Sequence, residues 1–185
     1  MAEETGLESI MHLLAGAGLP ELGPGPRKSV LPHQELEASL REILSQSSLD
    51  SLNSDLIRAL VLLWHDRLDA AHGIAQEIEN ADGSFLHAIV HRREPDFSNA
   101  RYWFGRTGDH ACFPEIASKV TTLLDSYGRS DLKSRLIIDG KWDSFAFVDL
   151  CQEASRRPSS NSGVELLRRI QGIESEALLE HLFTD

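Results

Sequence analysis

The stretch DLIRALVLLWHDRLDAAHGIAQEIE, residues 55–79, decides the fold. Its apolar side chains recur every three to four residues, which predicts one long α-helix. At about 100° per residue, these side chains cover an arc of about 140°. A helix with so wide an apolar face is expected near the centre of a domain. The arc consists of Leu56, Ile57, Leu60, Leu63, Trp64, Leu68, Ala71, Ile74, Ala75 and Ile78.

The rest of the chain also reads as helices separated by short turns. Residues 136–140 are too few to decide between a strand and a loop. Because strand signals are otherwise nearly absent, we expect an all-α fold, an irregular helical bundle around the long central helix. The other expected helices are 5–14, 33–46, 85–93, 99–106, 114–128, 145–156 and 164–183.

The N-terminal region differs in composition from the remainder. Residues 16–32 read GAGLPELGPGPRKSVLP, which cannot hold a helix or a sheet and predicts a flexible linker. The expected organisation is therefore a short helix plus linker over 1–32, followed by a single helical domain over 33–185. The N-terminal helix can dock on its own chain or across a homodimer.

Charge and composition narrow the classes of partner. The net charge of −11 opposes nucleic acid, because affinity for phosphates rests on Lys and Arg, and it disfavours an anionic membrane surface. No apolar run approaches the roughly 18 residues that a spanning helix needs. Cys112 and Cys151 lack the spacing of a metal-binding pair, so we expect reduced thiols in a cytoplasmic protein.

A histidine-rich segment predicts the functional site. His65, Asp69 and His72 have the spacing i, i+4, i+7, which places them along one face of the expected long helix. His87 and His91 repeat the i, i+4 spacing in the next helix. If the two helices pack together, these five side chains form a pocket for catalysis or for a metal ion. Imidazole and carboxylate suit Zn, Fe, Mn or Ni, and histidine without a metal suits acid–base chemistry. The competing interpretation is that these histidines lie on helix surfaces or have satisfied ring nitrogens in the core.

Residues beyond the histidines would bind the substrate. Adjacent guanidinium groups can clamp a carboxylate or phosphate, but we favour an internal ion network in which Glu94 and Asp96 pair with them; two arginines at a helix C-terminus also complement its dipole. Three aromatic residues in a row cannot all face one core, so we expect one or two of them to line a groove or an interface. The substrate-binding candidates are Arg92, Arg93, Glu94, Asn99, Tyr102 and Trp103.

A resemblance to a known family is a further line of evidence. It rests on the strings WHDxLDxAH, HRREPD and NAxYWF, which lie between residues 64 and 104. Together they resemble the signature of an uncharacterised bacterial and fungal family that has no established activity. The resemblance covers mainly residues 60–115 and implies no mechanism. A second resemblance rests on the Arg67-x4-His72 spacing, which is similar to that of helical HEPN-type ribonucleases. Leu68 departs from the polar residue that those enzymes prefer after the arginine.

Three functions therefore stay open. The first is a helical protein with a histidine–carboxylate pocket, metal-binding or acid–base, between the long helix and the following one. The second is a non-catalytic helical module that binds a small molecule or a peptide. The third is a HEPN-like ribonuclease, which the acidic chain disfavours. The sequence does not decide whether the protein is an enzyme.

Overall fold

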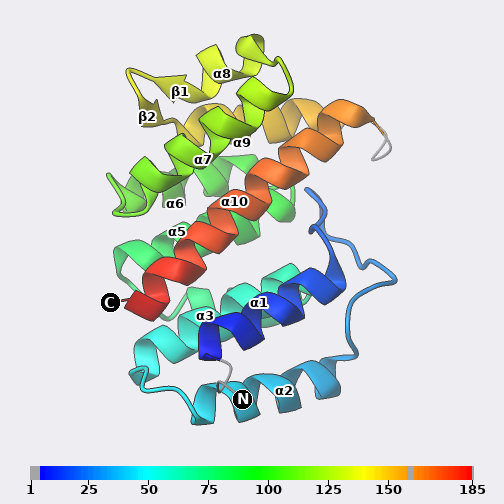
Figure 1. Cartoon of the computed structure of the whole chain (residues 1–185), viewed down its shortest axis with the longest axis vertical. Helices are drawn as coiled ribbons and strands as arrows, with labels where there is room; N and C mark the ends of the chain where they lie inside the picture. Colours follow the sequence, from blue (N-terminus) through cyan, green and yellow to red (C-terminus); the bar gives the residue numbers. More distant parts are fainter. Residues whose placement is uncertain (1–4, 158–160, 185) are drawn as a thin grey trace.

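The computed structural model describes residues 5–157 and 161–184 and confirms the all-α fold. Ten helices and one two-stranded hairpin make up this part of the chain (Figure 1). The helices are α1 Gly6–Ala17, α2 His33–Ser45, α3 Ser51–Trp64, α4 Leu68–Ala75, α5 Ala81–Arg93, α6 Phe97–Thr107, α7 Phe113–Ser126, α8 Ser130–Leu136, α9 Ser144–Ala154 and α10 Ser162–Thr184. The strands are β1 Ile137–Ile138 and β2 Lys141–Trp142.

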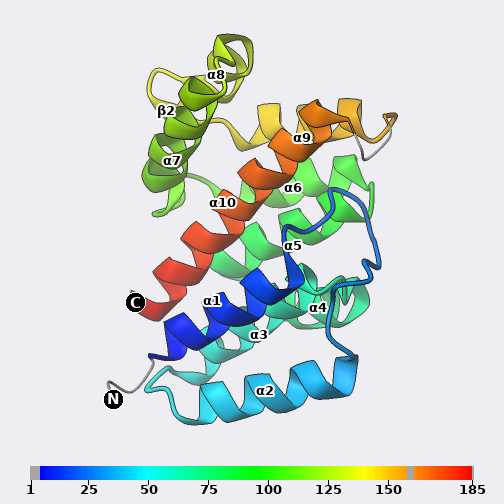
Figure 2. The same cartoon turned by 45° about the vertical axis from the view of Figure 1, so that its right-hand side comes forward.

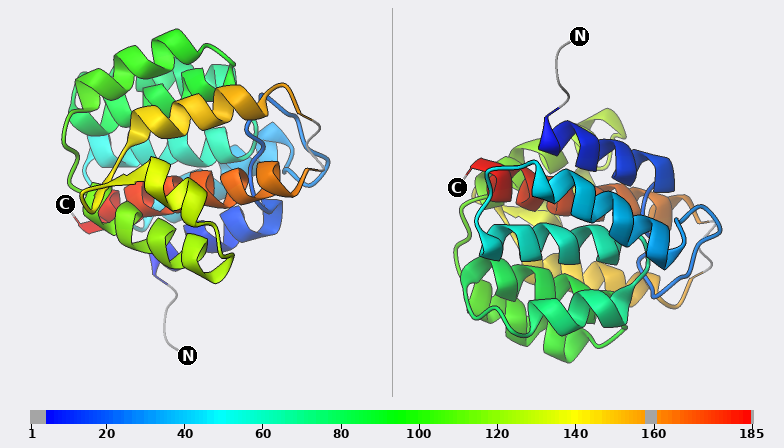
Figure 3. Two further views of the ribbon diagram at one scale, coloured as in Figure 1. Left: turned by 90° about the horizontal axis from the view of Figure 1, so that it is seen from above. Right: turned by 90° about the horizontal axis from the view of Figure 1, so that it is seen from below.

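The helices form a bundle, and α5 and α10 lie in its middle (Figure 1). Helices α1, α2 and α3 lie at one end, and α7, α8, α9 and the hairpin lie at the other (Figures 1 and 2). Seen from below, α1, α2 and α3 lie side by side (Figure 3). Every residue of α5 from Gly83 to Arg93 is buried, so α5, rather than a helix over 55–79, is the central helix. None of the described helices is long and apolar enough to span a bilayer.

The long helix expected over residues 55–79 is broken, and this corrects the prediction. Helix α3 ends at Trp64 and α4 begins at Leu68. Between them Asp66 has a φ of 61°, in the left-handed region that costs a non-glycine residue about 1 kcal/mol. Its carboxylate accepts hydrogen bonds from Arg27 (2.9 Å from Nε) and Arg93 (2.6 Å from Nη2). These two contacts hold Asp66 outside a helix.

The N-terminal segment is packed on the body, contrary to the expected flexible linker. Helix α1 contacts α2, α3 and α10 and buries Ile10, Leu14 and Ala17. The irregular residues after α1 are held by Arg27, whose Nη1 donates to the carbonyl groups of residues 17–19. Gly25 has a φ of 79°, and a Cβ there would lie 2.7 Å from the Asp66 carboxyl carbon. The glycine therefore permits the close approach that brings Arg27 to Asp66.

Candidate metal centre

Three histidines meet where α4 packs against α5. His87 and His91 are one turn apart on α5, and their rings stack with centroids 4.7 Å apart. The ring of His72, from α4, lies 4.7 Å from His87 and 4.8 Å from His91. Each residue offers one ring nitrogen, and these nitrogens all lie within 4.8 Å of one another. The i, i+4 spacing in α5 thus provides two members of the cluster, and tertiary packing of α4 provides the third.

The turn between α4 and α5 fixes this packing. Asn80 caps α5, since its side chain accepts a hydrogen bond of 2.7 Å from the Gly83 backbone N–H. A Cβ on Gly83 would lie 2.1 Å from the Ile78 carbonyl oxygen. Only glycine therefore allows the chain that leaves α4 to pass so close to the first turn of α5.

The carboxylate of Glu94 hydrogen-bonds to one of the three rings, that of His72, and lies close to a second, that of His91. One of its oxygens lies 3.2 Å from Nδ1 of His72, and the other lies 3.3 Å from Nδ1 of His91. Carboxylates that bind one imidazole nitrogen fix the tautomer and leave the other nitrogen free to bind a metal. Glu94 was expected to bind the substrate; here it is placed to support His72 and His91.

His87 is the unusual member of the cluster. It is buried, and neither of its ring nitrogens has a hydrogen-bond partner among the described residues. Buried polar atoms almost always have a partner, so such an atom calls for an explanation. Burial, followed by the charges of His91 and His72, lowers the pKa of His87 to about 4. The ring is therefore neutral at pH 7, which is the form that binds metals.

Aromatic residues of α6 cover one side of the cluster. Trp103 stacks on His87 with ring centroids 4.1 Å apart, and the guanidinium of Arg106 lies over the same indole. Tyr102 is mostly exposed beside Trp103. On the other side, about a quarter of the His72 and Glu94 side chains is exposed, so the cluster opens to solvent there.

Two predicted ligands lie outside the cluster, and the helix break at Asp66 explains this for His65. His65 points toward the N-terminal segment, where its Nδ1 accepts a hydrogen bond from the Leu31 backbone N–H and its Nε2 lies 3.3 Å from the Leu13 carbonyl. Asp69 is exposed on α4 and does not join the cluster. The i, i+7 spacing of His65 and His72 places two side chains on one face only along an unbroken helix, whereas Asp69 shares α4 with His72.

The predicted substrate-binding arginines are structural, which is a further correction. Arg92 and Arg93 are at most 1% exposed, so neither can reach a substrate. Arg92 pairs with Glu174 of α10 at 2.5 Å, and Arg93 pairs with Asp66. Both belong to an internal ion network, one of the alternatives that the sequence left open.

The remaining substrate-binding candidates, Asn99, Tyr102 and Trp103, lie on α6. Asn99 is exposed and donates a hydrogen bond to Asp96, the residue that caps α6. Of the residues expected to bind a substrate, Glu94 and Trp103 contact the histidine cluster. Arg67, the arginine of the ribonuclease-like spacing, donates to the Leu31 carbonyl.

A second cluster, formed by Asp82, His110 and His181, was not predicted. One oxygen of Asp82 lies 2.9 Å from Nε2 of His110 and 3.2 Å from Nε2 of His181. The backbone N–H of Cys112 donates to Nδ1 of His110, so the proton of that ring is on Nε2 and points to Asp82. His110 therefore has both nitrogens in hydrogen bonds. We interpret this cluster as a contact that ties α10 to α5, and the first cluster is the better metal site.

Comparison of the chain with known protein families, curated proteins and solved structures gives no match.

Proposed function

We propose that His72, His87 and His91 bind one transition-metal ion of the Zn, Fe, Mn or Ni class. The observation that carries this proposal is the buried His87 ring, whose two nitrogens have no partner among the described residues although two further imidazoles adjoin it. A metal ion would give this ring the partner it lacks. Glu94 supports the proposal because it hydrogen-bonds to Nδ1 of His72, which leaves the other nitrogen of that ring for a metal, and it lies 3.3 Å from Nδ1 of His91.

The required movement of the rings is small. With metal–nitrogen bonds of about 2.0–2.1 Å, ligands of a tetrahedral site lie about 3.3 Å apart. The ring nitrogens span up to 4.8 Å, so metal binding would draw them together by up to about 1.5 Å. His72 is the ring expected to move, since it is partly exposed and comes from the short helix α4.

Three protein ligands with an opening to solvent favour a reactive site. Structural zinc sites use four protein ligands, whereas catalytic sites keep a position for water or substrate. The opening lies beside His72 and Glu94, where a bound water could be activated for hydrolysis. Without a metal, the same neutral imidazoles could move protons, which is the acid–base form of the proposal.

The two cysteines indicate the cellular compartment that we propose for the protein. Cys112 and Cys151 are both free and buried. Because free thiols persist in a reducing environment, we place the protein in the cytoplasm.

Metal analysis tests the proposal directly. The untagged full chain, incubated with Zn²⁺ or Ni²⁺ and then desalted, should retain about one ion, and His87→Ala and His72→Ala should each lose it. His33→Ala is the matched control, because His33 is exposed at the start of α2. Ni²⁺ should also quench the fluorescence of Trp103 through His87, and Trp103→Phe should remove that quenching. Wild-type protein that retains no metal, or a His87→Ala variant that retains as much as the wild type, would contradict the proposal.

A further inference from the structure

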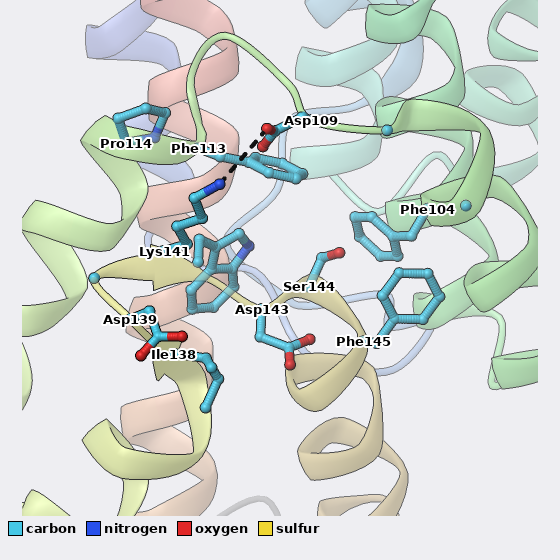
Figure 4. Close-up of a pocket in the computed structure, with 14 residues that line it drawn as sticks. Phe104, Asp109, Phe113, Pro114, Ile138, Asp139, Lys141, Asp143, Ser144 and Phe145 are labelled. Atoms are coloured by element: carbon cyan, nitrogen blue, oxygen red, sulfur yellow. Dashed lines mark ion pairs between the residues drawn. The ribbon is translucent and has the colours of Figure 1, made fainter.

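A cleft of about 850 Å³ lies between the β1–β2 hairpin and the end of α6 (Figure 4). The hairpin and the first residues of α9 line one side, and Phe104, Gly108 and the start of α7 line the other. None of the three clustered histidines lines it, so it is separate from the proposed metal site. Its volume falls in the range of pockets that bind small molecules.

Aromatic and aliphatic side chains form the walls of the cleft. Phe104, Phe113 and Trp142 are buried, each presenting little of its surface to the cleft. Phe145 and Ile138 lie at the cleft and are 45% and 47% exposed. The cleft thus combines a packed aromatic wall with apolar surface that a ligand could cover.

The polar groups of the cleft are mostly acidic. Asp109, Asp139 and Asp143 contribute three carboxylates, of which that of Asp143 also caps α9 by accepting a hydrogen bond from the Ala146 backbone N–H. Lys141 contributes the only ammonium group among the lining residues. Lys141 and Asp109 are joined by an ion pair of 4.0 Å (Figure 4), but their side chains are 78% and 87% exposed. So exposed a pair adds little stability and can separate when a ligand enters.

We propose that this cleft binds an organic cation that carries its ammonium group on an apolar or aromatic body. The three carboxylates attract a positive charge, and the acidic chain as a whole reinforces that preference. Aromatic walls accept the apolar body and stabilise the ammonium group through cation–π attraction. An anion of the same size would be repelled by the same carboxylates. This inference does not depend on the metal site.

Benzyltrimethylammonium is the test probe, and 3-phenylpropionate, an anion of similar size, is the comparison. Both would be titrated into chelator-treated, ¹⁵N-labelled full chain. We expect benzyltrimethylammonium to bind at least tenfold more tightly, with shifts at the Lys141 and Ser144 amides and at the Trp142 indole. Binding should weaken as salt is raised, because exposed charges are screened. His87→Ala should bind the cation as the wild type does, so that failure of the metal proposal and failure of this one are distinguishable.

Matched variants separate a built site from general attraction to an acidic protein. Phe145→Ala should weaken binding about fivefold, and Asp139→Asn should weaken it about threefold; asparagine also tolerates the φ of 50° at that position. Asp55→Asn removes an equal charge from an exposed position on α3 and should change nothing. The proposal is wrong if both probes bind equally, if the shifts map elsewhere, or if Asp55→Asn weakens binding as much as Asp139→Asn.

Discussion

The buried ion pair between Arg92 and Glu174 allows the sharpest test of the fold. Both side chains are fully buried, and one guanidinium nitrogen lies 2.5 Å from a Glu174 oxygen. Burial raises the pKa of Glu174, and the charge of Arg92 opposes that rise. Replacing Glu174 by glutamine keeps the shape of the side chain and removes its charge.

The structure sets the size of the expected effect. After Glu174→Gln, the Arg92 guanidinium would keep a contact of 3.5 Å to Gln171 and the face of Phe147, whose centroid lies 4.5 Å away. Neither neighbour carries a negative charge. Removing one partner of a buried pair costs about 3–5 kcal/mol. For a chain of this size, that loss lowers the melting temperature by about 6–20 °C.

Urea unfolding and calorimetry of the wild type, Glu174→Gln and the double variant Arg92→Met/Glu174→Leu provide the assay. Because two well-packed apolar side chains often replace a buried ion pair without loss, the double variant should recover most of the stability. A cost below about 1 kcal/mol for Glu174→Gln would refute the reasoning, since the cation would then have another counter-charge. So would a double variant less stable than Glu174→Gln.

Three further outcomes are expected. Burial lowers the pKa of His65, so its contribution to stability is present above the unfolded value of about 6.5 and is lost as the pH falls toward the folded pKa; urea midpoints between pH 7.5 and 5 should fall less steeply in His65→Gln. Asp66→Asn leaves Arg27 and Arg93 without their counter-charge and should cost about 3 kcal/mol, with faster proteolysis of residues 18–32 as a second readout. His110→Ala should lower the melting temperature but leave the metal content unchanged, whereas loss of metal in that variant would move the site to the second cluster.

Local features of the structure were predictable from the sequence. Apolar periodicity indicated the helices, and the i, i+4 spacing of His87 and His91 placed two imidazoles on one face of α5. The prediction that a histidine from the preceding segment joins them is confirmed by His72 alone. These features depend on residues within a few turns of one another, which is the range over which sequence patterns are reliable.

Features that depend on distant residues were not predictable. The break at Asp66 follows from contacts with Arg27 and Arg93, and no glycine or proline marks it in the sequence. Because of this break, His65 does not lie on the same helix face as His72 and does not join the histidine cluster. The second cluster likewise joins Asp82 of α5 to His181 of α10, two residues that are far apart in the sequence.

Helix α5 concentrates the polar groups that the core must accommodate. It buries four large polar side chains, and a buried polar group is costly unless it has a partner. Arg92, Arg93 and His91 each lie beside a carboxylate. His87 has no such neighbour among the described residues, and its pKa of about 4 reflects burial with no compensating charge. Folding alone therefore does not explain why this position is a histidine.

His87→Leu separates a structural role from a functional one. An unpartnered buried polar group costs about 1–3 kcal/mol, so in chelator the leucine variant should be more stable than the wild type by about 1 kcal/mol. Zn²⁺ at saturating concentration should reverse the order, because a ligand stabilises only the protein that binds it. Urea unfolding with and without Zn²⁺ measures both effects. If the variant is less stable than the wild type in chelator, then His87 is needed for packing and the argument for a metal at this position fails.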